Sequence, residues 1–195
     1  MVKNLGTYVV LLAALTGCAS APSIPQYARN LGEQSAVVEN LGEGVTLVAL
    51  DATDSERWLY FDLDRADLVQ IGSPETNDQW DIAFQRFHVK SNGGVSGPGG
   101  VQIAPTRSTV FDDPPDLSTV EWLQDESGSG ERVRFAFAAQ GNWFRYDIRT
   151  HSLSSRERVS YVQTTEGAVF KLQMVSYYDR LLISGFPTFL FSQVK

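Results

Sequence analysis

Cys18 is the only thiol in the sequence, and its position beside an apolar segment is the first pattern that points to chemistry. Lys3 and the apolar run 9–15 precede it, and a basic start followed by a short apolar core is the plan of a secretory signal peptide. The run is far shorter than the ~20 apolar residues of a membrane-spanning helix. We therefore expect residues 1–17 to be a signal peptide that is cleaved on export.

Leu15, Thr16, Gly17 and Cys18 resemble the lipobox of bacterial lipoproteins. The resemblance implies that the Cys18 thiolate accepts a diacylglycerol and that the new amino terminus receives a further acyl chain such as palmitate. Two or more chains hold a protein on a membrane stably, whereas one chain is marginal. Ala19, and not Asp, follows the cysteine, which favours the outer membrane. The alternative is an ordinary buried cysteine in a cytosolic protein.

Other patterns that carry chemistry are incomplete. The glycine-rich segment 92–100 is not followed by Lys-Ser or Lys-Thr, as a phosphate-binding loop would be. Segment 62–67 spaces carboxylates at intervals but lacks the glycine and final glutamate of an EF-hand loop. With two histidines and a lipidated cysteine, a zinc site would need carboxylates as well, and we predict none. No nucleophile has a recognisable paired base, so we do not predict an enzyme.

The charge balance bears on the choice of partners. The 195 residues include 16 Lys or Arg and 23 Asp or Glu, for a net charge of −7. An acidic protein is repelled by phosphate backbones, which argues against nucleic acid as a partner. There is also no polybasic patch to draw the body onto anionic lipid, so acyl chains are the predicted membrane attachment.

The remaining chain is long enough for one domain with a core of its own and no disulfides. Residues 19–25 are small, polar and proline-bearing, which is typical of an extended tether. We place the lipidated cysteine and tether at residues 18–44 and a single domain at 45–195. The glycines of 92–100 indicate a tight loop inside that domain.

From about residue 45 the chain shows alternating and aromatic-rich runs, which indicate strands. We expect turns at 140–142 and 165–167, and a short helix near 116–124. Many short strands separated by turns predict a single antiparallel all-β domain with long loops and at most one or two short helices. The expected strands are 45–50, 58–63, 80–89, 133–138, 143–147, 159–164, 168–178 and 186–194.

An ordered set of short motifs resembles the HmuY-like lipoprotein family over most of residues 45–192. The motifs are WLYFDL at 58–63, WDIAFxR at 80–86, SNGGVSGxGG at 91–100, WxxYDxxTHxL at 143–153, YVxTxxGxxFKL at 161–172, SYYD at 176–179, SG at 184–185 and TF at 188–189.

The resemblance implies an antiparallel β fold on the bacterial outer surface. It also implies binding of haem, or another tetrapyrrole, between two axial histidines or methionines. Haem would then pass to an outer-membrane receptor in iron acquisition. Many relatives have no demonstrated ligand, so a second interpretation stays open: an envelope structural or protein-interaction module of the same fold.

A haem ligand needs a nitrogen or sulfur lone pair aimed at iron in an apolar pocket. His88 would share the apolar face of Trp80 if 80–89 is an unbroken strand, and the alternative is a hydrogen-bonded core histidine. His151 lies in a polar turn that it could simply stabilise. His88 and His151 are the candidate iron ligands, whereas Met174 alternates with apolar neighbours and is expected to fill the core.

Three cations are candidates for pairing with the propionates of a tetrapyrrole, namely Arg86, Lys90 and Arg107. A guanidinium meets a carboxylate through two parallel hydrogen bonds, which suits this role. The alternative for each of them is an ordinary solvated surface cation.

Overall fold

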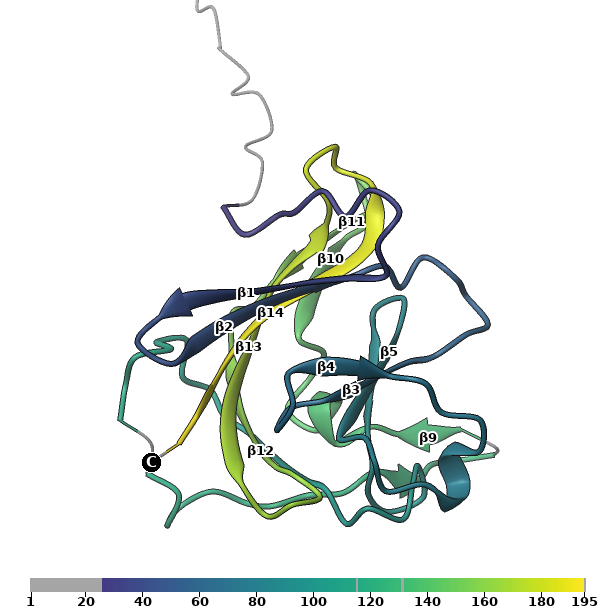
Figure 1. Ribbon diagram of the computed structural model, residues 1–195, viewed down its shortest axis with the longest axis vertical. Helices are drawn as coiled ribbons and strands as arrows, with labels where there is room; N and C mark the ends of the chain where they lie inside the picture. The colour runs from purple at the N-terminus through teal and green to yellow at the C-terminus, as the bar shows by residue number, and fades with distance from the viewer. Residues whose placement is uncertain (1–25, 115, 131, 195) are drawn as a thin grey trace, which may run out of the picture.

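The computed structural model describes residues 26–114, 116–130 and 132–194. The predicted signal peptide, the lipobox and Cys18 lie outside these described residues. Figure 1 shows that the described chain folds into two larger sheets that face each other, with two short hairpins beside them. No described helix is long and apolar enough to cross a membrane.

The larger sheet has the strand order β1-β2-β14-β13-β12-β7, and all its neighbours are antiparallel. β13 and β14 form its long central hairpin, and most of their residues are buried, as suits strands in the middle of a sheet. The strands are β1 (Ala36–Gly42), β2 (Val45–Leu50), β14 (Ser184–Gln193), β13 (Val169–Tyr178), β12 (Val159–Gln163) and β7 (Gln102–Pro105).

The second sheet has the order β4-β3-β5-β6 and is also antiparallel. Two separate hairpins, β8 with β9 and β10 with β11, and two 3-10 turns complete the fold, and the described residues contain no α-helix. The all-β antiparallel prediction is therefore confirmed. The elements are β4 (Asp67–Val69), β3 (Leu59–Asp62), β5 (Ile82–Gln85), β6 (His88–Ser91), β8 (Glu126–Ser127), β9 (Val133–Arg134), β10 (Phe144–Asp147), β11 (Ser152–Ser155), η1 (Pro74–Thr76) and η2 (Ala136–Ala138).

Aromatic rings from both sheets fill the space between them. Phe84 of β5 stacks on Phe189 of β14 with ring centroids 5.2 Å apart. Phe61 of β3 meets the same ring edge-on at 5.6 Å. All three side chains are fully buried. Because large aromatic rings bury much apolar area, this contact ties the two sheets into one core.

The predicted strand 80–89 is wrong, because the chain reverses in its middle. Arg86 has a φ of 52°, and Gln85 pairs with His88 across a two-residue turn. Directly paired residues of an antiparallel hairpin lie on the same face, so His88 points away from the core side that Phe84 occupies. The sequence did not signal this turn, since Arg and Phe are not typical residues for it.

Two other local predictions also fail. Segment 133–138 was expected to be one strand, but only Val133–Arg134 is extended and Ala136–Ala138 forms the 3-10 turn η2. Residues 140–142 therefore do not close a hairpin, and β10 pairs with β11 instead. The helix expected near 116–124 is absent: Asp116 accepts the Ser118 N–H as a cap would, but only a turn follows, and Leu123 is extended and bridges to Ile103 of β7.

The chain enters the larger sheet earlier than the predicted domain boundary at residue 45. Ala36–Gly42, assigned to the tether from the sequence, form β1 and pair along β2. Before it, Ala28 and Leu31 are buried, and Tyr27 packs on an apolar cluster that includes Val175. The segment from residue 27 onward thus belongs to the folded body.

The glycine-rich segment is a tight loop, as predicted, and one buried amide organises it. Asn92 Nδ2 donates to the carbonyl oxygens of Trp80 (2.8 Å) and Asn77 (3.1 Å), and its Oδ1 accepts the Gly99 N–H at 3.0 Å. A Cβ on Gly97 would lie within 2.1 Å of that Oδ1. Glycine is therefore required here by close approach of the asparagine.

Candidate ligand-binding pocket

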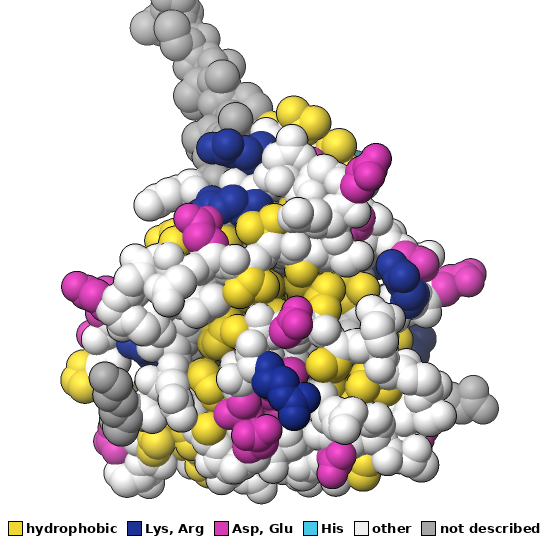
Figure 2. All heavy atoms as spheres, viewed as in Figure 1, with side chains coloured by type: hydrophobic (Ala, Val, Ile, Leu, Met, Phe, Trp, Pro, Cys, Tyr) yellow, Lys and Arg dark blue, Asp and Glu magenta, His cyan; other side chains and the backbone are white. Residues whose placement is uncertain are grey.

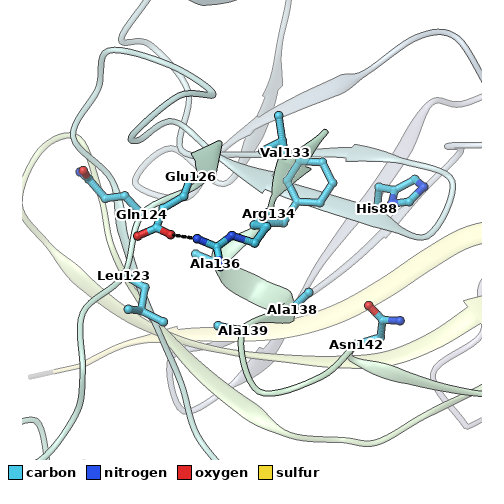
Figure 3. A pocket seen from close by; sticks show the side chains of 11 residues that line it. His88, Leu123, Gln124, Glu126, Val133, Arg134, Ala136, Ala138, Ala139 and Asn142 are labelled. Atoms are coloured by element: carbon cyan, nitrogen blue, oxygen red, sulfur yellow. Dashed lines mark hydrogen bonds and ion pairs between the residues drawn. The ribbon is translucent and has the colours of Figure 1, made fainter. Parts of the chain in front are cut away.

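An open pocket of about 520 Å³ lies between the start of β6, the turn η2 and the β8–β9 hairpin. Figure 3 shows His88 at one side of it and the side chains of Glu126 and Arg134 toward the other. A smaller cavity of about 90 Å³ is also lined by His88 and Phe135. The apolar part of the pocket lining consists of Leu123, Val133, Phe135, Ala136, Ala138 and Ala139.

Asp125 positions the elements that surround this pocket. Its carboxylate is buried and accepts the backbone N–H of Ser91 at 3.0 Å and of Ala136 at 2.8 Å. Its carbonyl oxygen accepts the N–H of Val95. Burial raises the pKa of this carboxyl, and the N–H donors act in the opposite direction. Through its carboxylate and its backbone carbonyl, this one residue joins the end of β6, the glycine-rich loop and the start of η2.

His88 is the pocket residue with a lone pair suited to a metal. Its ring lies 4.4 Å from the Phe87 ring and 5.9 Å from the Phe135 ring, between centroids. Partial burial lowers the pKa of its imidazole from the ordinary value. The imidazole is therefore neutral at neutral pH, which is the form that can donate a lone pair to iron.

Trp143 supports the hairpin turn that presents His88. Its indole Nε1–H donates to the Phe87 carbonyl oxygen at 2.8 Å, and its ring lies under the smaller cavity. The indole is almost fully buried. A buried donor that fixes a turn residue holds the neighbouring imidazole at a defined place on the pocket wall.

Sequence reasoning missed the cation that lines the pocket. Arg134 Nη2 pairs with Glu126 Oε2 at 2.6 Å across the short β8–β9 hairpin, and both side chains are largely exposed. Nothing in the local pattern distinguished Arg134 from other surface arginines. Only the fold brings it into one pocket with His88, which is 46 positions earlier.

His151 does not lie with His88. It stands in the turn of the β10–β11 hairpin with a φ of 53°, and its Nδ1 is 2.6 Å from the hydroxyl of Tyr146. Neither of the two cavities that include His88 includes His151. The geometry therefore supports one candidate ligand in the pocket and a turn residue at the hairpin.

Lys90 contacts aromatic rings on its own sheet. Its Nζ lies 4.6 Å from the ring centroid of Trp58, 5.1 Å from that of Tyr60 and 5.3 Å from that of Trp80. An ammonium over ring faces is stabilised by the π electrons. Burial lowers the pKa of this amine, while Glu75 and Asp125 act in the opposite direction. This arrangement satisfies Lys90 without a ligand.

The other candidates identified from the sequence also lie outside the pocket lining. Arg86 Nη1 donates to the Thr53 carbonyl oxygen at 2.9 Å, so the guanidinium joins the β5–β6 turn to the loop after β2. Arg107 is exposed just after β7. Met174 is buried in the core, as its alternation with apolar residues predicts.

A cluster of three carboxylates lies apart from the pocket. Carboxylate oxygens of Asp62, Asp64 and Asp81 are within 4.8 Å of one another. Asp81 is fully buried and accepts the N–H of Thr165 (2.9 Å) and of Leu63 (2.8 Å). Burial, with a smaller contribution from the neighbouring carboxylates, raises the pKa of Asp81 to about 6. Asp64 has a buried oxygen with no hydrogen-bond partner.

The residues of the pocket fit a flat apolar ligand with one acidic edge. Ligand pockets generally have about 300–1,000 Å³ and a mostly apolar lining with a few polar groups. The imidazole of His88 can reach a metal from one side. Arg134 uses Nη2 for Glu126, so its other N–H groups are available to a carboxylate. The fold and site therefore define an antiparallel β domain with an open binding pocket.

This chain belongs to the HmuY family. The family model of the HmuY protein matches residues 54–191, which include both facing sheets apart from the β1–β2 hairpin. The match thus covers the residues that form the pocket, from His88 to Asn142. No curated protein matches the chain.

Solved structures share the fold at low sequence identity. A Bacteroides vulgatus protein considered HmuY-like and haem-binding is 18% identical, with a TM-score of 0.58 over 83% of this chain and 98% of that chain. The ligand-free HmuY analogue of Tannerella forsythia is 16% identical, with a TM-score of 0.56 and the same coverage. A Bacteroides fragilis protein considered a lipoprotein is 16% identical, with a TM-score of 0.56 over 81% and 94%.

Proposed function

We propose that this protein is a lipid-anchored envelope protein that binds haem or another tetrapyrrole in the His88 pocket and takes part in bacterial iron acquisition. The observation that supports this most directly is the pocket itself, which combines an apolar lining with an imidazole and a guanidinium. Membership of the HmuY family, and the haem binding ascribed to the Bacteroides vulgatus relative, support the choice of ligand.

Each pocket residue has a distinct part in this proposal. His88 holds the iron through its neutral imidazole, since coordination requires the unprotonated ring. Arg134 donates to a propionate and remains paired with Glu126 through Nη2. Phe135 and the alanines of η2 supply the apolar wall against which the macrocycle packs.

The pocket supplies one protein ligand to the iron, because His151 lies in the β10–β11 turn. We therefore expect a five-coordinate or water-ligated haem rather than a haem held between two histidines. The spectrum distinguishes these cases, since two imidazoles give low-spin iron and one imidazole gives high-spin iron.

The test is a haemin titration of the chain from residue 18 onward, followed by its Soret absorption. We expect a saturable Soret shift that His88→Ala abolishes and His151→Ala leaves in place. The two variants are matched controls, because both remove an exposed histidine from a hairpin. A shift that depends on His151 would show that the pocket is wrongly assigned. No shift at equimolar haemin would favour the alternative, a protein-interaction module without a small ligand.

The pH dependence of haemin binding gives a further prediction. Protons and iron compete for the same His88 nitrogen, and partial burial lowers the pKa of the imidazole. Affinity should therefore decline as the pH falls, and the midpoint of the decline should lie below the ordinary histidine value of ~6.5. A titration at several pH values checks this, and an affinity that already halves well above that value would contradict it.

The membrane attachment is tested separately from the ligand. We expect radiolabelled palmitate to be incorporated in bacteria expressing the full chain, and Cys18→Ser to release the protein from the outer-membrane fraction. Ala19→Asp is the control for sorting, because the lipid is kept and only the proposed outer-membrane signal changes. An unlabelled wild-type product that still carries residues 1–17 would refute the anchor.

A further inference from the structure

Two hairpin turns at one end of the molecule expose an unusual number of large apolar side chains. Ile148 is 76% exposed, Leu181 is 70% exposed and Ile183 is 52% exposed. Monomeric proteins seldom leave such side chains grouped in water without a function. Figure 2 shows hydrophobic side chains at the upper end of the described body. We call this surface the apolar tip and define it as Tyr146, Ile148, Leu181, Leu182 and Ile183.

The β13–β14 turn holds its part of the apolar tip rigidly. The buried carboxylate of Asp179 accepts the N–H of Leu181 at 2.9 Å and of Ile183 at 2.8 Å. Its backbone also exchanges hydrogen bonds with Leu182 and Ile183, and Leu182 has a φ of 63°. The turn thus projects three consecutive apolar side chains without the freedom of an ordinary loop.

The β10–β11 turn is built in a similar way and lies beside the first one. Asp147 Oδ1 accepts the Arg149 N–H at 2.8 Å, directly after the exposed Ile148. The Leu153 N–H of β11 donates to the Tyr178 hydroxyl at the end of β13, at 2.7 Å. This bond places the β10–β11 hairpin next to the strand that leads into the other turn.

Each turn pairs its apolar residues with an exposed arginine, namely Arg149 beside Ile148 and Arg180 beside Leu181. Apolar residues that enter a bilayer interface are commonly accompanied by cations, which contact lipid phosphates. The loop after β2 carries the exposed carboxylates of Asp54 and Glu56, which offset the two arginines. Charge is therefore not the main attraction of this surface to a bilayer, and the apolar side chains supply that attraction.

The chain enters the fold at the same end. Ala36 of β1 pairs with Leu50, and the next residues, Asp51 and Ala52, bond to Ser35 and to Gly185 at the start of β14. The β13–β14 turn immediately precedes β14. Seven residues, 19–25, lie between Cys18 and the described chain, and the eight Cα-to-Cα steps from residue 18 to residue 26, at ~3.5 Å each, reach at most about 28 Å. Figure 1 shows the first described residues and the β13–β14 turn toward the upper end of the molecule.

We propose that the apolar tip rests on the lipid bilayer that carries the anchor, with its aliphatic side chains among the headgroups. The short tether keeps the domain near the surface, and the tip fixes which end faces it. This inference rests on the proposed lipid anchor. The proposal predicts that the glycine-rich loop faces away from the bilayer. Gly99 of this loop lies against Thr165, which is in the turn at the end of β13 opposite to the apolar tip.

The test reproduces the anchor chemically, so that it does not depend on lipidation in the cell. The chain from residue 18 onward is coupled through its only thiol to a maleimide phospholipid, in phosphatidylcholine vesicles with some phosphatidylglycerol and brominated lipid. Ile183→Trp and Val95→Trp are matched variants, with 52% and 53% exposure of the native residues at the two ends of the molecule. We expect brominated lipid to quench the added fluorescence at position 183 and not at position 95.

Equal quenching at both positions, or none at either, would overturn the proposal. A second variant, Leu181→Ser with Ile183→Ser, should lower the vesicle partitioning of the uncoupled chain by roughly tenfold, since it removes two of the five apolar side chains of the tip. Unchanged partitioning would also overturn it. So would sedimentation showing a dimer that this variant dissociates, because the tip would then be a contact between two copies. If haem binding or native lipidation fails, these outcomes keep their meaning.

Discussion

The buried carboxylate Asp81 makes stability depend on pH in the direction opposite to that of most acidic residues. Its pKa in the folded state is about 6, whereas its ordinary value is 3.8. Between these values the unfolded chain has released the proton and the folded chain still binds it. The contribution of Asp81 to the free energy of unfolding is therefore fully present below about pH 4 and is lost as the pH rises. Above about pH 6 it no longer changes with pH.

The size of the effect follows from the difference between the two pKa values. A tenfold difference in proton affinity corresponds to about 1.4 kcal/mol, so Asp81 lowers the free energy of unfolding by about 3 kcal/mol between pH 4 and pH 8. His88 contributes in the opposite direction, since its pKa is lowered and its protonation destabilises the fold at acid pH. A comparison of variants that both keep His88 removes this contribution.

The decisive variant is Asp64→Asn, which removes a negative charge beside Asp81 and leaves its N–H donors in place. We expect this variant to have a lower Asp81 pKa, a flatter decline of stability with pH and a higher stability than the wild type at pH 8. Asp67→Asn, three residues later on the exposed side of β4, is the control and should keep the wild-type slope.

Urea unfolding followed by tryptophan fluorescence, at half-unit steps from pH 4 to pH 8, measures these free energies. EDTA should be present throughout, because a bound cation would neutralise the three carboxylates. The reasoning is refuted if Asp64→Asn and Asp67→Asn give the same dependence on pH as the wild type.

Two further predictions concern the supports of the pocket and the glycine-rich loop. Trp143→Phe should cost about 1–3 kcal/mol, because it leaves the Phe87 carbonyl without its donor; urea unfolding measures the loss, and an unchanged midpoint would contradict it. Gly93→Ala should destabilise strongly, since its Cβ would lie within 2.1 Å of the Val101 carbonyl oxygen. Gly72→Ala meets nothing within 4 Å and should be nearly neutral, and equal melting temperatures for both variants would refute the argument.

The parts of the fold that were predicted correctly are strands whose apolar residues are bounded by turn residues. Segments 45–50, 159–164 and 168–178 are such runs, and they coincide closely with β2, β12 and β13. The turn at 165–167 joins the last two, as expected from Gly167. Local pattern is sufficient here because apolar runs and turn residues indicate the same structure.

The errors arose where a side chain distant in sequence decides the backbone. Residues 135–138 alternate aromatic and small side chains like a strand, yet Asp125 accepts the Ala136 N–H and favours a 3-10 turn. The reversal at Arg86 is held by its guanidinium on Thr53, 33 positions earlier. No local propensity contains such contacts, so they appear only in the folded structure.

The candidate site was predicted only in part for the same reason. His88 was selected from its chemistry, but its direction was inverted by the unseen turn. Its pocket partners, Arg134 and Asn142, come from segments far along the chain that no spacing rule relates to it. The sequence could identify His88 as a candidate ligand. Only the packing of η2 and the β8–β9 hairpin could show which residues surround it.

The position of β14 in the larger sheet governs when the molecule can be completed. This C-terminal strand lies between β2 and β13, so it joins the N-terminal hairpin to the rest of the sheet. During synthesis or threading through a narrow channel, the β1–β2 hairpin and the β13–β12–β7 part of the sheet share no paired strand until residues 184–193 emerge. Pairing over such long sequence separations is slow. The order of strands thereby delays completion of the larger sheet until β14 has emerged.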